Sequence, residues 1–358
     1  MKILRLKVKT PQNIDLNSWE ITHYISRFAS YHYKSEVINE LKGHIINGKK
    51  ANNIFILSNS FRIDSPYKLL DNIHINETNI YSLLNMGKAL PIFPNALLFK
   101  LNFSFTVLNF IYDHNPKLKK ECKRKAYFLT HYKSFLTDNF IDFSREFCDK
   151  HFVGLKKVKF NSARKNIEKE LRNYNALNKV FNVDLSKLNI NDIESHAEKF
   201  KSKFAYLQRP VVGIIDNDND TINILQVNTI QRNKLAKAFF QLTDLHKTNP
   251  FDFNIDSFGI IIKKILYREK EKLENESLER DIALKDQQII KLKIQNMASA
   301  MKVLSRITDN NDLPANRREL LDGHLFNILQ EIDSGLVDKA TIISRGKSIE
   351  IKEIDILA

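Results

Sequence analysis

The stretch ALLFKLNFSFTVLNFIY, residues 96–112, decides the fold of the N-terminal part of the chain. Apolar and polar residues alternate along it from Phe99 to Val107. Because successive side chains of a strand point to opposite faces, this period of two predicts a long β-strand. Residues 125–133, KAYFLTHYK, are the expected partner strand. The basic run between the two segments would then form the connection of a hairpin.

Segments with strand-like alternation and segments with helical spacing flank this stretch, and together they predict an α+β fold. Further strands are expected at residues 1–10, 53–57 and 154–160, and as two hairpins, 211–225 and 339–356. Helices are expected at residues 25–46, 137–150, 162–181, 191–207, 231–242, 260–307 and 317–332. The chain is therefore expected to divide into three parts: an N-terminal β-rich domain (1–150), a central mixed domain (151–250) and a helical C-terminal region (251–358) with a long helix and a terminal hairpin.

The expected helix 260–307 carries apolar residues at alternating steps of four and three, which is the spacing of a heptad seam. These residues are Ile290, Ile294, Met297, Met301 and Leu304. The seam spans about two heptads. Two interpretations remain open: a helix packed on its own domain, and a helical hairpin or dimer seam that assembles the protein with partners.

The composition of the chain is that of a folded protein. Hydrophobic residues make up 43% of it, which is enough to bury a core, while Gly and Pro are sparse. The two cysteines, Cys122 and Cys148, cannot build a disulfide framework and indicate reduced thiols. Neither a signal peptide nor an apolar run long enough to span a membrane is recognised, so a cytoplasmic location is expected.

The positive charge of the chain is concentrated in one segment. The whole chain has 56 Lys and Arg against 42 Asp and Glu, a net charge of +14. Residues 115–172 hold 16 basic and 7 acidic residues, a net charge of +9. Such an excess favours a polyanionic partner: DNA, RNA or an anionic membrane surface. The alternative is the lysine-rich composition of an AT-rich genome, which would spread the charge evenly.

Two basic clusters within this segment are the candidate phosphate contacts. The first consists of Lys117, Lys119, Lys120, Lys123, Arg124 and Lys125, and the second of Lys156, Lys157, Lys159, Arg164 and Lys165, continued by Lys169 and Arg172. Nearby Tyr127, Tyr132 and Tyr174 would either stack on bases or pack in the core, and core packing is favoured. The alternative for both clusters is a solvated loop and a solvated helix face.

Catalytic alternatives are weaker, and no cofactor or metal is expected. Asp338, Glu350 and Lys352 have the spacing of a Mg²⁺-dependent nuclease, in which carboxylates and a lysine hold the ion and orient water. Arg318 and His324 fall within the loose spacing of a helical ribonuclease. Residues 216–220, DNDND, resemble the start of a calcium loop but lack its later glycine and glutamate, so a hairpin turn is expected.

The order of elements resembles RexA-like phage-exclusion proteins and, more distantly, KwaB-like DNA-binding proteins of anti-phage defence. The resemblance is carried by NNIFILSN (52–59), PNALLFKLN (94–102), VGLKKVKF (153–160) and IDSGLVDKATIISRGKSIEI (332–351), and covers about half of the chain. It implies a dimeric α+β protein that binds double-stranded DNA without sequence preference. The expected partners are therefore DNA in preference to RNA, a second copy in a homodimer or higher oligomer, and a second defence protein.

Overall fold

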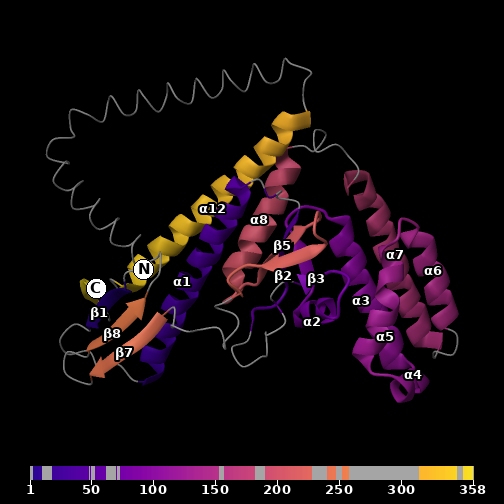
Figure 1. Ribbon diagram of the computed structural model, residues 1–358, viewed down its shortest axis with the longest axis horizontal. Helices are drawn as coiled ribbons and strands as arrows, with labels where there is room; N and C mark the ends of the chain where they lie inside the picture. Colours follow the sequence, from indigo (N-terminus) through magenta and orange to yellow (C-terminus); the bar gives the residue numbers. More distant parts are fainter. Residues whose placement is uncertain are drawn as a thin grey trace. The chain divides into compact units, whose positions relative to one another are not determined.

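The computed structural model describes residues 3–9, 18–47, 49, 53–61, 70, 73–152, 157–181, 190–227, 240–246, 252–257, 314–344 and 350–357 (Figure 1). Their contacts divide the chain into two compact units. Unit 1 comprises Met1–Ile38, Lys237–Leu320 and Gln330–Ala358, and unit 2 comprises Asn39–Ala236 and Leu321–Leu329. Each unit combines helices with an antiparallel sheet, which confirms the α+β class. The division at residues 150 and 250 stays a prediction.

Unit 1 contains a four-stranded sheet of order β7-β8-β1-β9. Its strands are β1 (Ile3–Lys9), β7 (Phe240–His246), β8 (Asp252–Ser257) and β9 (Glu350–Leu357), and β1 pairs antiparallel with both β8 and β9. Helices α1 (Ser18–Ile46) and α12 (Pro314–Ser344) contribute part of their length to each unit. Within unit 1, buried Ser35 of α1 donates a hydrogen bond to Asp333 of α12 at 2.9 Å.

Unit 2 contains a five-stranded antiparallel sheet of order β3-β6-β5-β2-β4. Its strands are β2 (Ile54–Leu57), β3 (Ile73–His74), β4 (Ala89–Pro91), β5 (Val212–Asp216) and β6 (Thr221–Ile224). The hairpin predicted at 211–225 is confirmed as β5 and β6. Asp216 closes its turn by accepting hydrogen bonds from the Asp218 amide at 3.2 Å and from Lys49 at 2.9 Å. The lysine holds the pKa of the Asp216 carboxyl below its usual range.

A layer of helices fills the rest of unit 2. Its elements are α2 (Asn79–Met86), α3 (Ala96–His114), α4 (Pro116–Glu121), α5 (Arg124–His131), the 3₁₀ helix η2 (Tyr132–Leu136), α6 (Phe140–His151), α7 (Lys157–Phe181) and α8 (Ile190–Tyr206). The helices predicted at 137–150 and 191–207 are confirmed as α6 and α8.

The strand predicted at 96–112 is wrong, because this segment forms helix α3. The Asn95 side chain starts the helix by accepting a hydrogen bond from the Leu98 amide at 3.0 Å. The most deeply buried apolar side chains then recur at helical spacing, at Leu98, Leu101, Leu108 and Ile111. Helices α5, α6 and α7 and the 3₁₀ helix all contact α3. Since neighbours surround the helix, its sequence is apolar on several faces and the alternation is coincidental.

Other predicted elements are also corrected. Residues 125–133 fall in α5 and the 3₁₀ helix, so the basic run before them is not a hairpin connection. Helix α7 begins at Lys157, where the end of a strand was expected. Helix α12 continues to Ser344, so the terminal hairpin is replaced by β9, which pairs with β1. The predicted helix 231–242 ends inside β7, and its earlier part lies outside the described residues, as does helix 260–307.

No helix in the described part of the chain is both long and apolar enough to cross a membrane.

Candidate nucleic-acid interface

Aromatic contacts hold the ends of α3, α6 and α7 together. Phe99, near the start of α3, contacts Tyr174, near the end of α7, with ring centroids 5.2 Å apart. Phe110, near the end of α3, contacts Phe152, directly after α6, at 5.7 Å. Helices α6 and α7 run antiparallel, because Asp149 in the last turn of α6 pairs with Arg164 in the first half of α7. The ends of α3 and α6 and the first half of α7 therefore lie at one end of the layer.

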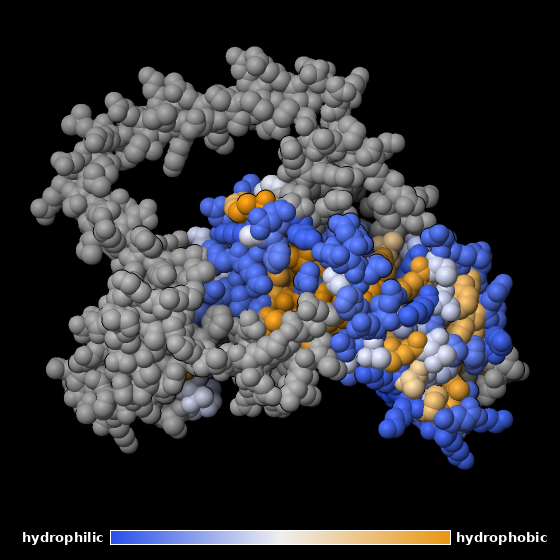
Figure 2. All heavy atoms as spheres, in the orientation of Figure 1, coloured by the Kyte–Doolittle hydropathy of each residue, from blue (hydrophilic) through white to orange (hydrophobic). Residues whose placement is uncertain are grey.

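The first basic cluster lies on α4 and α5, directly after α3 (Figure 1). Asn115 caps α4 by accepting hydrogen bonds from the amides of Lys117 at 3.0 Å and Leu118 at 3.3 Å. All of its cations are exposed except half-buried Lys125. In Figure 2, hydrophilic side chains lie along the lower edge of this part of the molecule, next to patches of hydrophobic side chains.

Arg124 differs from the lysines of the first cluster because it is held by neighbours. Its guanidinium pairs with the carboxylate of Asp113, the second-last residue of α3. It also lies over the ring of Tyr112, 5.6 Å from the centroid. The Tyr112 hydroxyl donates a hydrogen bond to the Cys122 carbonyl at 2.9 Å, which links the end of α3 to the α4–α5 turn. These contacts connect the start of α5 to the end of α3.

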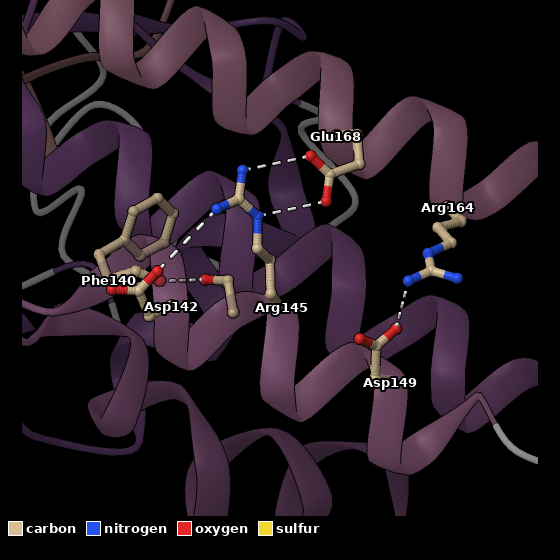
Figure 3. Close-up of polar contacts among 7 residues, drawn as sticks. Phe140, Asp142, Arg145, Asp149, Arg164 and Glu168 are labelled. Carbon is tan, nitrogen blue, oxygen red and sulfur yellow. Dashed lines mark hydrogen bonds and ion pairs between the residues drawn. The ribbon is translucent and has the colours of Figure 1, made fainter.

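The described residues of the second basic cluster lie on α7, and Figure 3 shows one of them, Arg164. Arg164 pairs with Asp149 of α6 at 3.2 Å. One turn further along α7, Glu168 accepts two hydrogen bonds from Arg145, at 3.3 and 3.4 Å, and Arg145 also lies 3.9 Å from Asp142. These ion pairs connect α6 to α7.

The remaining predicted residues of this cluster differ in whether the structure describes their side chains. Lys165 is exposed on α7, and so are the neighbouring Lys169 and Arg172. Lys156 lies outside the described residues. Lys157 and Lys159 lie in the first turn of α7, but their side chains are outside the described part of the structure. The expected strand-to-helix junction is thus a helix from Lys157 onward.

Several cations of both clusters carry charge that no described carboxylate neutralises. Lys117, Lys119, Lys120, Lys123, Lys165 and Lys169 make no ion pair with any residue that the structure describes. Arg124 and Arg164, in contrast, each have a carboxylate partner. Exposed ammonium groups without a carboxylate keep their full attraction for an external anion. These exposed lysines are therefore available to an external anion, whereas Arg124 and Arg164 are paired with carboxylates of the helical layer.

The three tyrosines near the clusters belong to the core, as favoured from the sequence. Tyr127, Tyr132 and Tyr174 are between 1% and 6% exposed. Burial raises the pKa of Tyr127 to about 12, and the Tyr132 hydroxyl donates a hydrogen bond to the Ile75 carbonyl at 2.8 Å. These rings cannot stack on bases without unfolding the helical layer.

Sequence reasoning missed the two aspartates that neutralise the arginines and a pair of histidines beside them. His131 of α5 and His151 of α6 have ring centroids 6.2 Å apart, and both approach the ring of Phe147. Partial burial lowers the pKa of both imidazoles below its usual value, and for His151 the neighbouring His131 and Lys150 act in the same direction. Such pairings join residues from different helices, so no local spacing reveals them.

The catalytic alternative gains no support from the described residues. Asp338 is exposed on α12, while Glu350 and Lys352 lie in β9, where Lys352 falls at a register shift against β1. The side chains of Glu350, Lys352, Arg318 and His324 lie outside the described part of the structure. Among the described residues, no group of three or more His, Cys, Asp and Glu side chains could hold a metal ion. The nuclease hypothesis stays a prediction.

Comparison with known proteins adds no relative: no protein family, no curated protein and no solved structure matches the chain.

Proposed function

We propose that this protein binds nucleic acid without sequence preference, through the exposed lysines of α4, α5 and α7. The observation that carries the proposal is the grouping of Lys117, Lys119, Lys120 and Lys123 next to the first half of α7, without carboxylate partners among the described residues. Lysine ammonium groups that contact phosphates release counterions, and this release supplies affinity that does not depend on base sequence.

Duplex DNA is the ligand that this face fits best. Proteins that bind single strands stack bases on exposed aromatic side chains. Tyr127, Tyr132 and Tyr174 are buried, so none of these three rings offers a stacking platform. A duplex keeps its bases stacked inside and exposes its phosphates, which matches such a surface. The resemblance to phage-exclusion and anti-phage defence proteins supports the same ligand and a dimeric protein that acts in the cytoplasm of an infected cell.

The decisive experiment measures affinity for a short DNA duplex as a function of salt concentration. The test variant replaces Lys117, Lys119, Lys120 and Lys123 with Gln. The control replaces four lysines elsewhere in unit 2, Lys88, Lys199, Lys201 and Lys203, and so removes the same charge. If all four test lysines contact phosphates, the slope of log K against log salt falls by up to about 3.6, from about 0.9 per contact. The control variant retains most of the slope.

Three outcomes count against the proposal. Equal losses in the two variants would mean that net charge alone attracts the duplex. An unchanged slope in the test variant would mean that these lysines are only solvated. Tighter binding of single-stranded DNA or of RNA, measured at the same salt concentrations, would contradict the assignment to duplex DNA. A plaque assay then tests the cellular role, since the test variant should lose any protection that the wild type gives.

A further inference from the structure

A cavity of about 440 Å³ lies in unit 2, away from the basic clusters. Edge strand β4, the start of α3, the end of α7 and the last turns of α8 line it, and it is open to one side. Most of its wall is apolar and includes Leu90, Phe99, Leu177 and Phe200. Its volume falls within the range of small-molecule sites, about 300–1,000 Å³.

The polar side chains of the wall are already occupied by the protein itself. Asn102 accepts a hydrogen bond from the Ala89 amide at 3.0 Å and donates one to the Ala89 carbonyl at 2.6 Å. This pairing also covers the outer edge of β4. Asn95 accepts the hydrogen bond from the Leu98 amide that caps α3. Both side-chain amides are thus held in place by bonds to the protein's own backbone.

Three lysines surround the cavity, and no carboxylate lines it. Lys88 precedes β4, while Lys199 and Lys203 lie one turn apart on α8. Lys88 and Lys199 are exposed, and the Lys203 ammonium lies 5.5 Å from the centroid of the Tyr206 ring. Lysine side chains commonly pack their methylene groups on apolar surface and keep the ammonium in water. The cavity thus combines apolar walls with positive charge at its rim.

We propose that this cavity binds a single aliphatic chain that carries an anionic head group, either a carboxylate or a phosphate. The chain would fill the apolar interior, and the head would lie among Lys88, Lys199 and Lys203. A nucleobase fits less well, because burying its donors and acceptors without partners costs about 1–3 kcal/mol for each group. The proposal goes beyond nucleic-acid binding and depends on different residues.

Isothermal titration calorimetry of the full chain tests this site with decanoate, decyl phosphate and decanol as probes, each kept below micelle-forming concentrations. The two anions are expected to bind with one saturable site and more tightly than decanol. The tighter of the two anions identifies the head group. If neither anion binds saturably, or if decanol binds as tightly as both, the proposal is overturned.

Two variants locate the binding. Lys199→Gln with Lys203→Gln should weaken the anions about fivefold per lysine, as expected for partly exposed ion pairs, and leave decanol unchanged. Lys201→Gln is the matched control, because Lys201 lies on the same helix but does not line the cavity.

The second variant, Leu90→Trp, should fill the cavity and abolish binding of all three probes, with its fold checked by thermal melting. If the Lys199→Gln, Lys203→Gln variant and the Lys201→Gln control bind the anions with equal affinity, the anions bind elsewhere and the proposed site is wrong. This conclusion does not depend on whether Leu90→Trp folds. The proposal also requires that decanoate still binds after Lys117, Lys119, Lys120 and Lys123 are replaced with Gln.

Discussion

Replacing Asp113 and Asp149 with Asn should strengthen DNA binding, although it removes two ion pairs from the protein. Asp113 neutralises Arg124 at the end of α3, and Asp149 neutralises Arg164 between α6 and α7. All four side chains are between 38% and 56% exposed. Ion pairs this exposed contribute about 0–1 kcal/mol to stability, so the double variant should remain folded. Its two arginines would then be available to phosphates.

The size of the effect follows from counterion release. Each additional phosphate contact steepens the slope of log K against log salt by about 0.9. Raising the salt fourfold, from about 50 to about 200 mM, then weakens binding by a further factor of about 3.5 for each released arginine. For both arginines the further factor is about 12. At low salt the double variant should bind more tightly than the wild type by a comparable amount.

Fluorescence anisotropy with a labelled duplex, measured at four or five salt concentrations, gives both affinity and slope. Glu198→Gln is the control, because it removes an exposed carboxylate from α8, where Glu198 pairs with Lys201 at 3.1 Å. The control should alter affinity only slightly. The reasoning is refuted if the control matches each single aspartate variant, or if the double variant remains folded and binds DNA more weakly than the wild type.

Three further predictions concern stability and can be checked by chemical denaturation. Burial lowers the pKa of Lys34 to about 8, so the unfolded chain binds more protons than the folded chain between pH 8 and 10.5. The unfolding free energy of the wild type, measured relative to that of Lys34→Met, should therefore rise by about 3 kcal/mol across that window. A difference between the two proteins that does not change with pH would contradict this prediction. Gly213→Ala should cost about 1–3 kcal/mol, because the new Cβ would lie 2.7 Å from Cε1 of fully buried Phe55. Asn95→Ala should cost about 1 kcal/mol by removing the cap of α3; a loss below a few tenths would show that the cap is dispensable.

Elements with local signals could be predicted from the sequence. The hairpin of β5 and β6 follows from two short apolar strands around a polar turn, and the Asp216 contacts in that turn are between near neighbours. Helices α6 and α8 carry their apolar residues on one face, which gives a clear helical period. These segments each have one buried and one exposed side, so their patterns carry information about conformation.

Elements with several buried faces were predicted wrongly. Helix α3 is in contact with helices on several sides, and it even buries Lys100, which donates a hydrogen bond to the Thr137 carbonyl at 2.8 Å. A helix in such surroundings has no polar face to reveal its period. The end of α12, with Thr341, Ile342 and Ile343, has strand-like composition but continues a helix that starts at Pro314. In α3 the packed surroundings outweigh the local preference.

The positive charge of the candidate site could be predicted from the sequence, but the different roles of its lysines and arginines could not. The concentration of cations in residues 115–172 is visible in the sequence, whereas the ion pairs of Arg124, Arg145 and Arg164 require the packed helices. The planar guanidinium holds a carboxylate in a defined geometry, and these three arginines are used in that way inside the layer. Lysine is a flexible, strongly hydrated point charge with no preferred geometry. If the proposed function holds, a surface that leaves its lysines to the ligand and pairs Arg124, Arg145 and Arg164 within the protein is suited to phosphates at varying positions, which is what binding without sequence preference requires.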